Sequence, residues 1–277
     1  MRDRIHSSGF TLVELVVTLV IVGLLLGGVL AGQRFKMQSE LVATIADVRA
    51  YGAATAIFLD RYSALPGDVK NANDRIPGCG QASLDCESGA SDSSVGDGNI
   101  GISGAIAAAQ VAGGPGPGRE TVLFWSHLVL ADLISGATMA GAASTYPAPV
   151  WGQTHPTAPV GGGFHAKDAI GPGPATLPGW PPLARKPFGS FLVLQAGVDR
   201  DLVLAGAGEQ VLSPLEAALI DLKIDDGDPF DGSVVGYGTV GGLNSSENCF
   251  AWTGVDRGVY NETSGRLDCG LAFQIAP

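Results

Sequence analysis

Residues 10–31 read FTLVELVVTLVIVGLLLGGVLA and hold a single ionisable side chain, that of Glu14. At about 1.5 Å per residue this run forms a helix roughly 33 Å long, enough to cross the ~30 Å hydrocarbon core of a membrane. The preceding residues 1–9, MRDRIHSSG, carry a net charge of +1 with the histidine neutral. Basic residues on a short flank remain in the cytoplasm, so the acidic remainder of the chain is expected on the other side of the membrane.

Glu14 separates three interpretations of this segment. A secretory signal peptide has an apolar stretch of about 7–15 residues and a small-residue cleavage site. Ala31-Gly32 could be such a site, but the stretch here is longer and contains a carboxylate. A plain membrane anchor fits the length, and Glu14 could reach the interface because it lies near the start of the helix. A charge inside a membrane helix still costs at least ~2.5 kcal/mol, which favours an interpretation that gives the carboxylate a role.

The third interpretation rests on a resemblance. The stretch Ser8-Gly9-Phe10-Thr11-Leu12-Val13-Glu14-Leu15 resembles the prepilin cleavage site of type IV pilins and type II secretion pseudopilins. The resemblance implies that prepilin peptidase cuts between Gly9 and Phe10 and that Phe10 becomes an N-methylated first residue. It also implies that Glu14 neutralises the new α-ammonium of a neighbouring subunit, because a buried opposite-charge pair is tolerable where a lone charge is not. An intrachain pair is the alternative, since residues four apart share a helix face.

The helix is expected to continue well beyond the apolar run. Apolar residues between positions 35 and 59 recur at three- and four-residue steps with charges between them, which predicts an amphipathic helix to about Tyr62. Pro66-Gly67 then provides a stop signal. The expected organisation is a leader at 1–9, a long helix at 10–62 with its membrane or filament-core half at 10–31, and a globular domain at 63–277.

The globular domain is expected to be α+β, with a small antiparallel sheet packed on the long helix in a pilin-like arrangement. Helices are predicted at 120–134 and 213–223, the second opened by a capping box of Ser213 and Glu216. The predicted strands are short and lie late in the chain, at 190–195, 201–204, 234–237, 249–253 and 271–275. Residues 136–187 exceed a normal connection and are expected to form an irregular surface excursion.

Four cysteines allow three pairings, and the connectivity stays open at this stage. They are Cys79, Cys86, Cys249 and Cys269. Their spacing suggests one bond between Cys79 and Cys86 and a second between Cys249 and Cys269. In the oxidising periplasm such bonds are expected to form. The absence of a C-x-x-C pair disfavours a zinc or redox site. The C-terminal pair resembles the disulfide that bounds a variable region in many pilins.

An acidic cluster is the one candidate metal site. Asp225, Asp226, Asp228 and Asp231 place four carboxylates within seven residues. Calcium prefers such oxygen ligands, although the spacing does not match an EF-hand. Some pseudopilins bind calcium in such loops, so the resemblance makes calcium an expectation here. The alternative is a solvated turn, and no other cofactor is expected.

The sequence disfavours two large classes of function. A net charge of −11 and a pI near 4.6 argue against a broad nucleic-acid-binding surface. No G-x-S-x-G, H-E-x-x-H or G-x-x-x-x-G-K-[ST] pattern occurs. Of the four histidines, His155 and His165 lie in segments rich in proline and glycine, and Ser126-His127 shares a predicted helix with Asp132. We therefore expect no enzyme.

The resemblance implies a structural subunit, and the long loops of a 277-residue chain favour a minor one. It implies an inner-membrane precursor with a periplasmic domain that joins other pilin or pseudopilin subunits in a pilus or pseudopilus. The implied partners include an inner-membrane assembly platform with a motor ATPase, because the chain has no nucleotide-binding pattern of its own. Two alternatives remain, a membrane-anchored sensing or binding module and a pilus-displayed adhesin that binds through residues 136–187.

Overall fold

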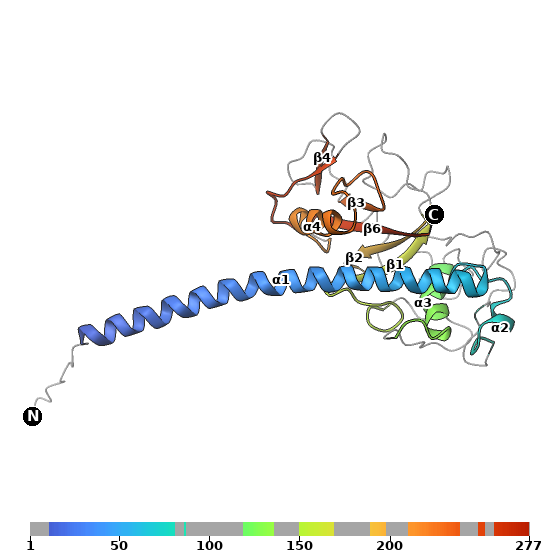
Figure 1. The fold of residues 1–277 in the computed structure, drawn as a ribbon, viewed down its shortest axis with the longest axis horizontal. Coiled ribbons are helices and arrows are strands. Elements are labelled where there is room, and N and C mark those ends of the chain that lie inside the picture. The colour runs from blue at the N-terminus through green and yellow to red at the C-terminus, as the bar shows by residue number, and fades with distance from the viewer. Residues whose placement is uncertain are drawn as a thin grey trace, which may run out of the picture.

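The computed structural model describes residues 11–80, 86, 119–135, 150–168, 189–197, 210–238, 249–252 and 258–276. Its dominant element is the helix α1 (Leu12–Tyr62) of 51 residues, whose N-terminal half projects away from the rest of the molecule (Figure 1). The Thr11 hydroxyl caps its start by accepting from the Glu14 backbone N–H at 3.3 Å. Ser63, with φ 52°, ends it in the left-handed conformation, three residues before the predicted stop. The expectation of one long helix is confirmed.

A four-stranded antiparallel sheet in the order β1-β2-β6-β3 packs against the C-terminal half of α1. Its strands are β1 (Gly163–Asp168), β2 (Ser190–Gln195), β3 (Val234–Gly238) and β6 (Cys269–Ala276). A second sheet pairs β4 (Phe250–Trp252) with β5 (Gly258–Tyr260). The α+β class and the antiparallel sheet are therefore as predicted, and the predicted strand at 201–204 lies outside the described residues.

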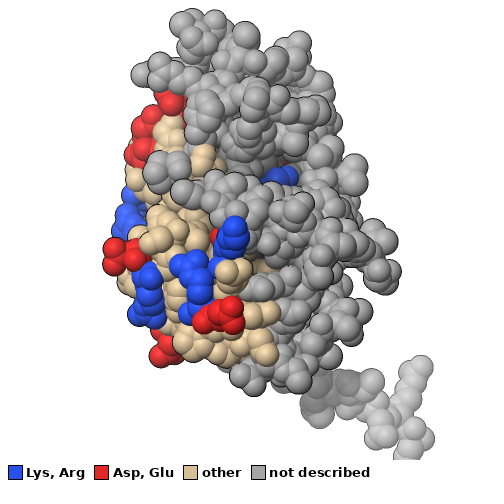
Figure 2. Space-filling model, turned by 90° about the vertical axis from the view of Figure 1, so that its right-hand side faces the viewer, with Lys and Arg blue, Asp and Glu red and all other residues tan. Residues whose placement is uncertain are grey.

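Three shorter helices complete the described fold. They are α2 (Ala72–Arg75), α3 (Arg119–Leu130) and α4 (Pro214–Ile224). The capping box predicted for α4 is present, with Ser213 accepting from the Glu216 backbone and the Glu216 side chain accepting from the Ser213 backbone. The end of the molecule where α1 stops shows side chains of both charge signs interspersed over its described part (Figure 2). Two of its cations cap backbone carbonyls, Arg61 at Ala131 and Arg75 at Lys70.

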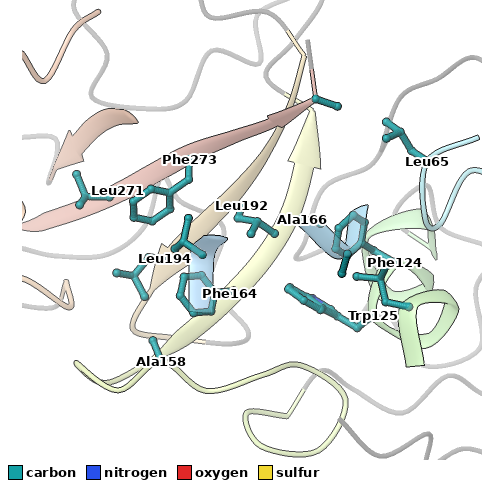
Figure 3. Close-up of a cluster of buried hydrophobic side chains, with 14 of the residues drawn as sticks. Leu65, Phe124, Trp125, Ala158, Phe164, Ala166, Leu192, Leu194, Leu271 and Phe273 are labelled. Atoms are coloured by element: carbon teal, nitrogen blue, oxygen red, sulfur yellow. The ribbon is translucent and has the colours of Figure 1, made fainter. Parts of the chain in front are cut away.

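The main core lies between the sheet, α1 and α3. Alternate residues of the strands, among them Phe164, Leu192 and Phe273, point toward Phe124 and Trp125 of α3 (Figure 3). Period-2 alternation accounts for this division, because successive side chains of a strand point to opposite faces. The opposite face carries a second, smaller buried cluster of Phe191, Val193, Val235, Tyr237 and Ala272.

The expectation of an irregular excursion at 136–187 is wrong for residues 163–168, which form β1, whereas residues 150–162 are turns and isolated bridges. Strand β1 is an edge strand that pairs with β2 along its whole length. The glycines that suggested a loop are needed for close packing instead. A Cβ on Gly163 would collide with the ring of Trp151. A Cβ on Gly162, whose φ is 63°, would collide with the backbone carbonyl of Gln195.

Two disulfides close the ends of the domain. Cys79 is bonded to Cys86, and Cys249, which directly precedes β4, is bonded to Cys269 at the start of β6. The second bond therefore connects the two-stranded sheet to the four-stranded sheet. Of the three possible pairings, the structure has the one that the spacing favours.

Candidate assembly surface

The N-terminal half of α1 is an apolar surface with nothing packed on it. An 18-residue window of this helix has a mean hydropathy of 2.7 and is 0% buried. Every side chain from Leu12 to Leu30 is exposed. A helix of this length and composition can cross a membrane. The segment is thus suited to membrane anchoring or to burial against other helices, since a large exposed apolar surface marks a site that binds a membrane or another protein.

Glu14 lies in the first turn of this apolar helix and is its only acidic residue before Glu40. Its backbone N–H is used by the Thr11 cap, while its side chain is exposed. A carboxylate in the first turn also interacts favourably with the helix dipole. Gly9 and Phe10, the predicted cleavage residues, lie outside the described residues. The helix therefore presents one carboxylate, a single turn from the predicted new N-terminus.

The C-terminal half of α1 has an apolar surface on both sides. The inner side packs on the domain through Leu41, Ile45, Val48, Phe58 and Tyr62. The opposite side, which we call the α1 outer face, is exposed and carries Val42, Ala46, Ala53 and Ala56, with Arg49 and Asp60 among them. These residues recur at steps of three, four and seven, so they form one stripe. A helix that is largely apolar on a solvent-facing side has the surface expected of an interface.

The predicted calcium ligands mainly cap the turn that follows α4. The Asp225 carboxylate accepts from the backbone of Ser233 and Val234, and Asp228 accepts from Phe230 and Gly258 at 3.1 and 3.0 Å. Asp226 and Asp231 accept from amides within the same loop. Hydrogen bonds of this kind, from carboxylates to the backbone amides of one turn, are what the solvated-turn alternative predicts.

The structure groups the acidic residues differently from the prediction. Oxygens of Asp225 and Asp226 lie within 4.8 Å of one another and of Asp221, which the sequence did not single out, whereas Asp228 and Asp231 are not in this group. Three carboxylate oxygens at such distances fit only part of a calcium shell of six to eight ligands. Calcium binding at this loop stays a prediction.

Asp221 is a buried carboxyl on the inner side of α4. Its Oδ2 accepts from the hydroxyl of Tyr260 at 2.8 Å, and its Oδ1 accepts from the Gly227 backbone at 3.3 Å. Burial raises the pKa of Asp221 to about 7, against the opposing effect of these two hydrogen bonds, and the neighbouring Asp226 and Asp225 add to the rise. The sequence signal was available, because an aspartate four residues after Ala217 and seven after Pro214 falls on the same face of the predicted helix as these two residues.

Replacing Asp221 by asparagine should flatten the pH dependence of stability. With a folded pKa above the unfolded one, the wild-type carboxyl stabilises the fold most at low pH and loses this contribution as the pH rises from about 4 to about 7. The slope has an upper limit of ~1.4 kcal/mol per pH unit. Urea unfolding of both proteins at pH 5 and pH 8 measures it. Asp231→Asn, an exposed change in the same loop, is the control, and equal slopes in Asp221→Asn and wild type would contradict the assignment.

The histidines are core residues in the structure. His127, His155 and His165 are buried, and the rings of His155 and His165 lie 4.6 Å apart. Burial lowers the pKa of His127 and of His155 to about 3. His127 accepts a hydrogen bond from the Gly67 backbone through Nδ1 at 2.9 Å. The expectation that His155 and His165 belong to surface loops is wrong, because the turn before β1 folds into the core, but their surroundings are aromatic packing.

The comparison with known families agrees with the N-terminal features. Residues 4–30 match the family model of the prokaryotic N-terminal methylation motif. No curated protein and no solved structure matches the chain. The match covers Gly9, Phe10 and Glu14 and all but the last residue of the apolar run 10–31, and the α+β fold behind it is pilin-like. The motif, the apolar helix that carries it and the α+β fold behind it support a protein of the type IV pilin or pseudopilin class.

Proposed function

We propose that the chain is a minor structural subunit of a type IV pilus or a type II secretion pseudopilus. In this proposal the chain is first an inner-membrane precursor with its domain in the periplasm. Prepilin peptidase hydrolyses the bond between Gly9 and Phe10, and Phe10 is then N-methylated. An assembly platform with a motor ATPase moves the subunit from the membrane into the filament.

The exposed apolar surface along α1 supports this proposal most directly. A membrane accounts for the exposure of residues 12–30 but not for the α1 outer face, which extends to Ala56 alongside the domain. Packing of neighbouring α1 helices would cover both parts. Small residues such as Ala46 and Ala53 let helix backbones approach closely, as at helix interfaces in membranes.

Glu14 supplies the register in this proposal. Once the leader is removed, the α-ammonium of Phe10 enters an apolar helix bundle, where an unpaired charge is costly. A carboxylate of the adjoining subunit compensates it, and a buried polar pair can fix the axial position of helices. The subunit therefore exchanges lipid contacts for helix contacts at a defined position along the filament axis.

A matched pair of substitutions tests the proposal. Ala53→Glu places a charge in the α1 outer face, and Thr263→Glu places the same charge in an exposed turn of the domain away from α1. We expect Ala53→Glu to lower incorporation into filaments by at least about tenfold, because each ~1.4 kcal/mol of lost packing is a factor of ten. Thr263→Glu should assemble nearly normally. The measurement is an immunoblot of sheared filaments against the membrane fraction of the native host.

The alternatives make different predictions in this experiment. A membrane-anchored sensing module would stay in the membrane fraction with or without the charge, which would contradict the proposal. A pilus-displayed adhesin would assemble like any other subunit and would lose attachment only when its binding loops are changed. Within residues 150–168, residues 163–166 of β1 are buried, and the exposed positions are scattered between 150 and 161.

A further inference from the structure

Helix α4 carries a second apolar face that no described element covers. Its inner side is buried through Pro214, Ala217 and Ile220. Its opposite side, which we call the α4 outer face, presents Leu215 and Leu222, while Ala218 and Leu219 between them are partly buried against the main core. Leu215 is 40% exposed and Leu222 is 65% exposed. These two leucines are seven residues apart, so they lie on one side of the helix, two turns from each other.

The same chain offers an exposed apolar surface of the opposite charge. Phe35 on α1 is 75% exposed, although it lies beyond the apolar span. Arg34 and Lys36 flank it on both sides of the helix, and both are exposed. Lys36 forms an ion pair at 2.7 Å with Glu40 one turn further on. We call residues 34–36 the α1 basic segment.

The α4 outer face ends in negative charge. Leu222 is followed by Asp225, Asp226, Asp228 and Asp231, of which Asp226 and Asp231 are exposed. Lys223 is the one cation in this stretch, which leaves a net charge of −3. An apolar face with an acidic end thus matches an exposed phenylalanine with a basic flank on each side. Such complementarity favours one partner and one orientation.

The two surfaces cannot meet within one chain. Arg49 donates to the Lys223 carbonyl at 3.5 Å, which fixes the end of α4 beside position 49 of α1. Phe35 lies 14 residues earlier on this continuous helix, about 21 Å away along its axis (Figure 1). A second copy with a parallel α1 that is displaced by about 21 Å brings its α1 basic segment to the α4 outer face. Because the two surfaces differ, this contact is heterologous, and it places one copy after another along the filament axis instead of closing into a symmetric dimer.

We propose that the α4 outer face binds the α1 basic segment of a second copy of this chain. The inference rests on the proposed filament function and adds a specific contact outside the apolar helix bundle. Leu222 packs on Phe35 in this contact, while Asp226 and Asp231 face Arg34 and Lys36.

Cross-linking of the full-length chain in its host tests this contact. Two tagged forms, Leu222→Cys and Phe35→Cys, are expressed together and treated with a short bismaleimide. The native cysteines do not react, because all four are in disulfides. We expect a product that carries both tags, at a yield at least about tenfold above that of Leu222→Cys with Asp60→Cys, an exposed control position further along α1. Both substituted side chains are exposed, and near-UV circular dichroism checks that the fold is unchanged.

Charge reversal provides a second, independent readout. Arg34→Glu with Lys36→Glu should lower the cross-linking yield about tenfold, and Asp226→Lys with Asp231→Lys in the partner form should restore it. A yield equal to the control, or a product with a different membrane protein, would overturn the contact. Sheared filaments without this product would refute the contact and leave the proposed function intact. The product in membranes without any filament incorporation would refute the function and leave the contact intact.

Discussion

Replacing Glu14 by leucine should leave the chain in the membrane at its normal level and remove it from filaments. The substitution takes the only carboxylate out of the apolar span, so membrane insertion becomes easier by at least ~2.5 kcal/mol. The α-ammonium of Phe10 then has no opposite charge to meet in the helix bundle. An uncompensated buried charge costs several kcal/mol, so incorporation should fall by two orders of magnitude or more.

The measurement compares the membrane fraction with sheared filaments by immunoblot. Thr18→Leu, one turn further along the same helix, is the matched control, because it also makes the span more apolar without touching the carboxylate. We expect it to assemble. If Glu14→Leu assembles as well as Thr18→Leu does, the carboxylate has no part in assembly and Glu14 is only an interfacial residue of an anchor.

Breaking the bond between Cys249 and Cys269 should have the largest effect on the stability of the domain. The bond closes a loop with a sequence separation of 20 and joins the two sheets. For such a loop, loss of the cross-link is worth about 3 kcal/mol in the chain-entropy account. We expect the double substitution Cys249→Ser with Cys269→Ser to lower the urea midpoint markedly, as monitored by the fluorescence of the buried Trp125 in detergent-solubilised protein.

The other disulfide provides the comparison. Cys79 and Cys86 are only seven residues apart, so Cys79→Ser with Cys86→Ser should cost less. An unchanged midpoint after loss of the Cys249–Cys269 bond would show that β4 and β5 contribute nothing to the cooperative unit. A larger loss at the short loop would show that local packing around α2 outweighs loop closure.

The elements with strong local signals were predictable from the sequence. Helix α1 begins as a continuous apolar run and continues with a helical period between positions 35 and 59, and α4 begins with Ser213, Pro214 and Glu216 in capping-box positions. Strands β2, β3 and β6 are apolar runs bounded by turn residues. For these elements the local preference and the tertiary fold agree, so pattern alone is sufficient.

Other features depend on contacts that no local pattern reveals. Strand β1 reads GFHAKD, in which the alternation of apolar and polar residues covers only four positions and follows a stretch rich in proline and glycine. It becomes a strand because β2 offers an edge and Phe164 and Ala166 reach the core. Helix α2 has only four residues and therefore no detectable period. The acidic cluster was visible, but whether its carboxylates bind a cation or cap backbone amides depends on the path of the turn. The α4 outer face was visible only once the structure showed which side of the helix is buried.

Mass spectrometry of the chain purified from filaments and membranes of its native host tests the central claim most directly. The account predicts a mature chain that begins at Phe10, carries one methyl group on its α-amino nitrogen and lacks residues 1–9. An intact Met1, or a chain trimmed near Ala31, would contradict it, because neither form places a free amine one turn before Glu14.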